Sequence, residues 1–226
     1  MLEIKVINFK SEPKQNYFAP EWNWYLFETY INKIDFDDLA KFCLSKKNQI
    51  LKLPSSVNPN NNKITDGETG LGKNSTTAKF QNYNVLKWKN KNITLLKESI
   101  VEFHNEILKY FKYPLIKELW VQCWVNIMKK GQKIEPHIHG VFPTTYLGGH
   151  FCVQCNNTST YYINPINQIS NPHTHKSVNK IGKLTIFQNN IPHYTDIHKG
   201  NKDRITIAFD LETTKPKGRN NYLRLI

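Results

Sequence analysis

The period of the hydrophobic pattern changes along the chain, from mixed strands and helices in the first half to strands in the second. Two short strands are expected within residues 1–35, where "LEIKVINF" alternates apolar and polar positions and "NWYLFETYI" is aromatic and β-branched. A helix is expected over residues 36–51, because acidic residues lie in its first turn and lysines follow. Helical spacing of apolar residues over 92–112 predicts a second helix, capped by Asn92 or Thr94.

Residues 52–79 are rich in Pro, Gly, Asn and Ser, and this composition predicts a long loop. A loop of this length is uncommon unless it is functional or disordered. Its length therefore favours the hypothesis that it forms a lid over an active site.

From residue 118 onward the pattern is that of strands. "ELWVQCWVNIM" alternates between two faces, and "YLGGHFCVQC", "STYYINP", "GKLTIFQN" and "DRITIAFDLE" follow with turn residues between them. Many short strands in series predict an antiparallel sandwich or jelly roll, with the earlier helices buttressing one sheet. We expect one domain over residues 1–226, with N-terminal strands and helices in 1–115 and the jelly-roll core in 116–215.

Composition narrows the class of protein. The chain has 226 residues, of which 12% are aromatic, so it can bury a core and is not disordered. It contains no apolar run of about eighteen residues and no signal-peptide pattern, and its four cysteines are too few for a disulfide framework. We therefore expect a cytoplasmic protein with no membrane partner.

The formal net charge of +13 can attract nucleic acid. The lysines and asparagines, however, are scattered through every loop instead of forming one block. A basic jelly roll that binds nucleic acid without catalysis is therefore kept only as an alternative.

The candidate chemistry begins at "EPHIHG", where two histidines are two residues apart. On an extended strand, His137 and His139 point to one face and can bind one metal ion. His193 follows the strand "KLTIF", and Arg204 and Thr206 share a face of "RITIAFDL". Imidazole suits Fe(II), Zn and Cu, and the arginine fork binds a carboxylate through two hydrogen bonds. The set therefore predicts a metal site next to a site for a dicarboxylic acid.

In this order, "WVNIMKKG", "PHIHG", "GGHFCV", "FQNNIPHYT" and "DRITIAFDL" resemble the Fe(II)- and 2-oxoglutarate-dependent oxygenases. The branch of small oxygenases from microbes and phages, which is similar to prolyl hydroxylases, matches best. The resemblance implies a mainly β fold with supporting helices (α+β), the cupin-like double-stranded β-helix or jelly roll.

The resemblance also implies roles for residues. His137 and His193 match the two metal-binding histidines of the family. Arg204 matches the arginine that binds the distal carboxylate of 2-oxoglutarate, and Thr206 matches its hydroxyl partner. Asn126 lies where the family often places a polar side chain that contacts this cosubstrate. The cofactors implied are Fe(II), 2-oxoglutarate and O2.

His139 departs from the family pattern, because it occupies the position that usually carries Asp or Glu. Three-histidine iron sites occur in related β-barrel dioxygenases, so His139 is expected to be the third metal ligand. Glu135 shares strand parity with both histidines and is an alternative, and Asp196 is a weaker one.

The function predicted is a dioxygenase of the hydroxylase type. It would couple oxidative decarboxylation of 2-oxoglutarate to succinate with C–H oxidation of a peptide, protein or small-metabolite substrate, and a peptidyl-prolyl group is one candidate. A cupin-like three-histidine metalloprotein or dioxygenase that does not use 2-oxoglutarate is the alternative.

Overall fold

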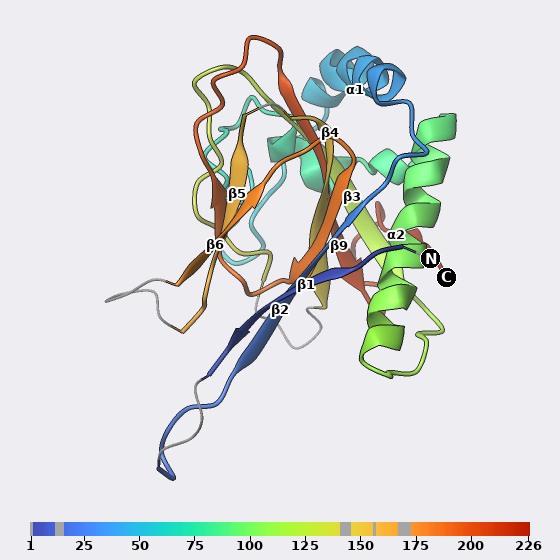
Figure 1. Ribbon diagram of the computed structural model, residues 1–226. Coiled ribbons are helices and arrows are strands. Elements are labelled where there is room, and N and C mark those ends of the chain that lie inside the picture. The colour runs from blue at the N-terminus through green and yellow to red at the C-terminus, as the bar shows by residue number, and fades with distance from the viewer. Residues whose placement is uncertain (1, 12–15, 141–145, 156, 167–172) are drawn as a thin grey trace.

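The protein is built from antiparallel sheets that face each other, with helices on one outer side (Figure 1). The computed structural model describes residues 2–11, 16–140, 146–155, 157–166 and 173–226. The elements within them are β1 (Lys5–Lys10), β2 (Asn23–Tyr30), α1 (Phe36–Leu51), η1 (Thr77–Asn82), η2 (Val85–Lys87), α2 (Lys91–Tyr110), β3 (Trp120–Met128), β4 (Leu147–Gln154), β5 (Ser159–Ile163), β6 (Thr174–Val178), β7 (Lys183–Gln188), β8 (His193–Thr195), β9 (Arg204–Glu212) and β10 (Leu223–Arg224).

Within the described residues the strands form a sheet of seven, in the order β1-β2-β7-β4-β9-β3-β10, and a sheet of three, in the order β6-β5-β8. The fold is the double-stranded β-helix that the resemblance implied. Among the described helices, none combines the length and apolar character that crossing a bilayer requires.

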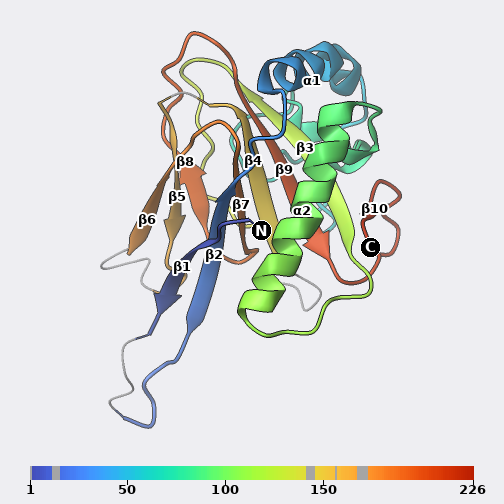
Figure 2. The same cartoon turned by 45° about the vertical axis from the view of Figure 1, so that its right-hand side comes forward.

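The strand β3 is buried on both of its faces. Its outward residues Val121, Cys123 and Val125 are fully buried in one core with the apolar faces of α1 and α2, and Figure 2 shows α2 lying along this side of the sheet. Of its inward residues, Trp124 and Asn126 line a cavity, and Gln122 donates to the carbonyls of Phe80 and Tyr83. The strand thus has two buried faces, and the alternation predicted from "ELWVQCWVNIM" separates a helix-packed face from a cavity-lining one.

Both predicted helices are confirmed, with one correction at an end. The carboxylate of Asp35 accepts the backbone N–H of Asp38 and caps α1. The second helix is capped by Asn90, whose side-chain oxygen accepts the N–H groups of Asn92 and Ile93. Asn92 and Thr94 were therefore wrong as the cap, because both already lie inside the first turn.

Among the described elements, the sequence pattern missed three short strands, β6, β8 and β10. No strand was expected between "STYYINP" and "GKLTIFQN", yet Thr174–Val178 forms β6 and pairs along its length with β5. An edge strand that makes one ladder needs little apolar patterning, which explains the miss.

The long loop over 52–79 is held against β3 instead of projecting freely. The hydroxyl of Thr76 donates to the carbonyl of Val125 at 2.7 Å, and the hydroxyl of Thr77 donates to Asn126 Oδ1 at 2.7 Å. These bonds fix the end of the loop beside the inward face of β3.

His104 of α2 makes the fold sensitive to acid. It is fully buried, its Nε2 lies 2.7 Å from the hydroxyl of Tyr146, and burial lowers its pKa from 6.5 to about 4. As pH falls below 6.5 the unfolded chain takes up this proton before the folded protein does, so stability is lost progressively down to about pH 4.

Between pH 7 and pH 4 we expect the wild type to lose about 3 kcal/mol more unfolding free energy than His104→Gln. Urea unfolding at both pH values measures this difference, and equal losses in the two proteins would contradict it.

Candidate metal and cosubstrate site

Three histidines from two distant segments meet at one end of the space between the sheets. The N–H of His137 donates to the carbonyl of His193 at 3.1 Å, and the N–H of His193 donates back at 3.0 Å. The N–H of His139 donates to the carbonyl of Asn189 at 2.9 Å. One ring nitrogen of each histidine lies within 4.8 Å of the others, which is close enough for one metal ion.

The hydrogen bonds of the rings decide which nitrogen is free. The Nδ1 of His137 lies 2.9 Å from the carbonyl of Glu135, and the Nδ1 of His193 lies 3.0 Å from the carbonyl of Ile191. The Nδ1 of His139 lies 2.5 Å from Oδ1 of Asp210. A carbonyl or carboxylate oxygen accepts, so each Nδ1 carries the proton and each Nε2 keeps its lone pair.

Burial keeps the His137 and His193 rings neutral. Burial first and the neighbouring His139 second lower the pKa of His137 to about 4. Burial also holds the pKa of His193 well below its ordinary value, with the other two histidines acting in the same direction. Neutral imidazoles with free Nε2 atoms are the form that binds a divalent metal, so the residues fit Fe(II).

The two acidic alternatives lie outside this cluster. The carboxylate of Glu135 makes an ion pair with Lys133 at 3.0 Å. The carboxylate of Asp196 accepts the backbone N–H of Ser159 at 2.8 Å. Within the described residues, the group of side chains that could hold a metal ion consists of the three histidines.

Arg204 lies deep in the same cavity. It is 2% exposed, and its guanidinium donates to Thr158 at 3.2 Å and to Thr206 at 3.5 Å. Among the described residues it has no ion pair with a carboxylate. A buried cation without a counter-ion is costly, so the arrangement favours an anion as its missing partner.

The predicted polar residues Asn126 and Thr206 are brought next to each other, since β3 and β9 pair them directly. Both line the cavity, whose empty volume is about 420 Å³ and whose wall also includes the three histidines and Arg204. Thr77 donates to Asn126 Oδ1, so the amide nitrogen of Asn126 is the part left for a ligand.

His150 of β4 is a further cavity residue. The structure places it in the cavity wall, with its Nε2 at 2.7 Å from the hydroxyl of Tyr162. Its Nδ1 is buried and has no hydrogen-bond partner among the described residues. Burial and the charge of Arg204 hold its pKa well below the ordinary value.

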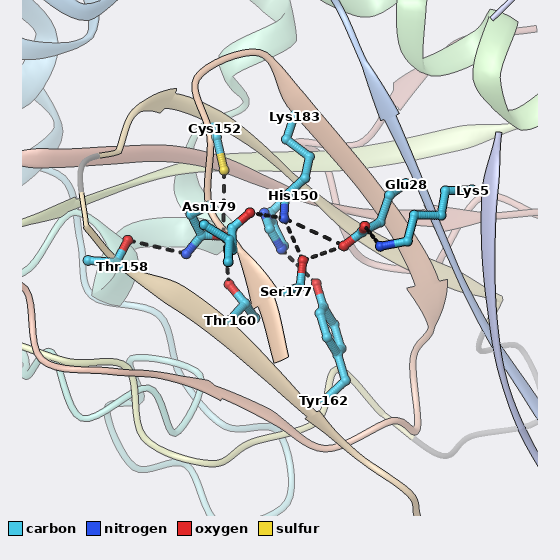
Figure 3. Close-up of polar contacts among 11 residues, drawn as sticks. Lys5, Glu28, His150, Cys152, Thr158, Thr160, Tyr162, Ser177, Asn179 and Lys183 are labelled. Atoms are coloured by element: carbon cyan, nitrogen blue, oxygen red, sulfur yellow. Dashed lines mark hydrogen bonds and ion pairs between the residues drawn. The ribbon is translucent and has the colours of Figure 1, made fainter. Parts of the chain in front are cut away.

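A buried polar network includes His150 and Thr160 of the cavity wall (Figure 3). Asn179 donates to Thr158, the hydroxyl that accepts from Arg204, and its carbonyl oxygen accepts from Thr160. On the other side the ammonium of Lys183 lies 3.5 Å from the carboxylate of Glu28 and donates to Ser177. Lys183 is thus paired with a carboxylate. Arg204 is held in place by neutral hydroxyl oxygens, so its positive charge remains available to an anion.

Asp210 was also missed, although parity along the strand could have found it. In "RITIAFDLE" it is six residues after Arg204 and shares the inward face with Arg204 and Thr206. It lies at the mouth of the cavity, beside His139.

The 52–79 loop reaches this mouth. The carbonyl of Thr69 accepts the N–H of Glu135 at 2.9 Å, and Asp66 and Thr69 line the opening together with His137. The loop therefore lies beside the site, as the lid hypothesis requires, and closure itself stays a prediction.

Comparison with known proteins identifies the class of this site. A family model described as "Putative 2OG-Fe(II) oxygenase" matches residues 122–210. A Pseudomonas putida prolyl-4-hydroxylase shares 8% identity over 84% of this chain and 93% of its own, with a TM-score of 0.52. A Trichoplax adhaerens prolyl hydroxylase, solved with a peptide fragment of hypoxia inducible factor, shares 11% over 82% and 83%, with a TM-score of 0.51. No curated protein sequence matches the chain.

At these identities the solved structures show a shared fold, and the family match supplies the class. The resemblance read from the ordered histidines and arginine is confirmed, and so is the enzyme class of 2-oxoglutarate-dependent oxygenases, by the family match over residues 122–210. The cofactors of this class are the Fe(II), 2-oxoglutarate and O2 that the sequence predicted.

We expect the purified protein to bind one Co(II), a visible-absorbing substitute for Fe(II), per chain. His193→Ala and His139→Ala should each weaken this binding by roughly 100-fold or more, because each removes a ligand nitrogen. Glu135→Gln should leave it within about threefold, because that carboxylate is turned to Lys133. Spectroscopic titration measures all four proteins, and a large loss in Glu135→Gln alone would make Glu135 the third ligand.

Proposed function

From the premise that residues 122–210 match the 2OG-Fe(II) oxygenases, we propose that this chain is a non-haem Fe(II)- and 2-oxoglutarate-dependent hydroxylase. The reaction converts 2-oxoglutarate, O2 and a substrate C–H group into succinate, CO2 and a C–OH group. Cytoplasmic location and an origin in phage or microbes remain part of the proposal.

The observation that carries the proposal is the cluster of three imidazoles in one cavity with a buried arginine that has no carboxylate partner among the described residues. His137, His139 and His193 would hold the metal. When bound, Fe(II) supplies the redox chemistry that joins the decarboxylation of 2-oxoglutarate to oxidation of the substrate. Arg204 and Thr206 would bind the distal carboxylate of the cosubstrate, which fixes its other end toward the histidines.

Other cavity residues would orient the cosubstrate and limit the access of water to the cavity. The amide nitrogen of Asn126 lies in the wall and can donate to a carboxylate or keto oxygen. The unpartnered Nδ1 of His150 can do the same in the tautomer whose Nε2 accepts the hydroxyl of Tyr162. Trp124 and Phe187 supply apolar surface beside the histidines. An apolar wall with a few polar groups is typical of small-molecule sites.

The prime substrate is proposed to be a peptide or protein residue, with a prolyl residue as one candidate. A groove lies outside His139. Its walls include Phe80 and Ile138 as well as Tyr222 near the C-terminal end of the chain. A groove that combines apolar and polar walls is suited to an extended chain more than to a small metabolite.

The alternative is a three-histidine dioxygenase that does not use 2-oxoglutarate. It accounts for His139 but gives no role to the unpaired charge of Arg204. The nucleic-acid alternative rests on net charge alone and has no structural observation in its favour.

Succinate formation with Fe(II), O2 and 2-oxoglutarate tests the proposal. Arg204→Ala should raise the KM for 2-oxoglutarate by roughly 100-fold, because two charge-assisted hydrogen bonds worth about 3 kcal/mol are lost. Arg204→Lys keeps the charge without the fork and should fall between Arg204→Ala and the wild type.

Arg224→Ala removes an exposed arginine and is the matched control, with an unchanged KM expected. Metal-loaded wild type should also gain thermal stability with 2-oxoglutarate, while Arg204→Ala should not. Metal binding without turnover or stabilisation by 2-oxoglutarate would overturn the proposal in favour of the alternative dioxygenase.

A further inference from the structure

We propose that Asp210 is a positioning residue of the metal site, which acts through His139. It fixes the tautomer of that ring, and it returns to the site the negative charge that a carboxylate ligand would have carried. The inference rests on the proposed function, because it concerns the ion that the histidines would hold.

The contact is direct and enclosed. Oδ1 of Asp210 lies 2.5 Å from Nδ1 of His139, and the two side chains are 16% and 6% exposed. The carboxylate accepts the Nδ1 proton, so Nε2 of His139 is the atom presented to the other two histidines. In a partly enclosed site this charge-assisted bond is stronger than it would be in water.

The three histidines differ in what holds them. His137 and His193 are each held by a neutral main-chain carbonyl, whereas His139 is held by a carboxylate. Three neutral imidazoles leave a divalent ion with its full charge. A carboxylate bonded to the far side of one ring makes that ring a more basic ligand and offsets part of the charge.

Asp210 has no competing cation. Although the chain carries a net charge of +13, Asp210 makes no ion pair with a lysine or arginine within the part of the chain that the structure describes. Its carboxylate therefore remains available to His139.

The neighbouring strand leaves room for the pair. Gly148 of β4 lies directly opposite Asp210 in the ladder. A Cβ atom at this position would lie 2.8 Å from Nδ1 of His139 and 2.5 Å from Oδ1 of Asn189. Only glycine lets the ring approach the strand that carries Asp210.

The experiment measures Co(II) affinity and the visible spectrum of the bound ion, independently of turnover. Asp210→Asn removes the charge with little change of shape, and Asp210→Ala also removes the acceptor. We expect roughly tenfold weaker binding for the first and up to about 100-fold for the second. Glu135→Gln is the matched control, because it neutralises a carboxylate near the site that does not contact a ring, and it should bind as the wild type does.

A double-mutant cycle separates action through His139 from a general field effect. In the His139→Asp background the ring is gone, so Asp210→Asn should leave the affinity unchanged or increase it by relieving repulsion between two carboxylates. Circular dichroism and melting of the metal-free proteins confirm that each variant is folded.

Three results would overturn the inference. They are wild-type affinity in Asp210→Asn, an equal loss in Glu135→Gln, and the same loss from Asp210→Asn with His139 replaced. None of these depends on succinate formation. Failure of the proposed function would instead appear as a wild type that binds Co(II) but does not turn over 2-oxoglutarate.

Discussion

The register of β9 between β3 and β4 is the constraint on which the rest of the site depends. It places Asn126 opposite Thr206 and Met128 opposite Arg204 on one side, and Gly148 opposite Asp210 on the other. Every second residue of β9 therefore faces the cavity, and a slip of one residue would turn the whole row outward into the helix-packed core. The proposed anion site, the cavity floor and the support of His139 all come from this single row.

Along that row the electrostatic character of the cavity changes in an order that suits the proposed reaction. The closed end carries the free positive charge of Arg204, while Lys183 nearby is neutralised by Glu28. Neutral imidazoles follow, and the carboxylate of Asp210 lies at the mouth. A dicarboxylic acid would meet the cation first at its distal end and the metal at the other, so the order itself favours one orientation of the ligand.

Much of this site could be read in advance because strand parity is a local property. The pairs His137 with His139 and Arg204 with Thr206 are each two residues apart, and two-residue spacing keeps side chains on one face. Asp210 lies on the same face as Arg204, six residues away, but was missed. Nothing in the local sequence indicated that its partner is His139. The cap at Asn90 and the strand β6 were missed for a similar reason, since neither is marked by apolar periodicity.

The sequence by itself determined both α-helices, the long strands with their two faces, and the set of chemically capable side chains, because these follow from spacing and residue type along the chain. Only the tertiary structure decided which groups meet. The bridge between His137 and His193 and the contact of Asp210 with His139 join distant segments, the second across 71 residues. The ion pair of Glu135 with Lys133 turns this carboxylate away from the histidines that are its neighbours in sequence. Such choices depend on packing between sheets, which no local pattern records.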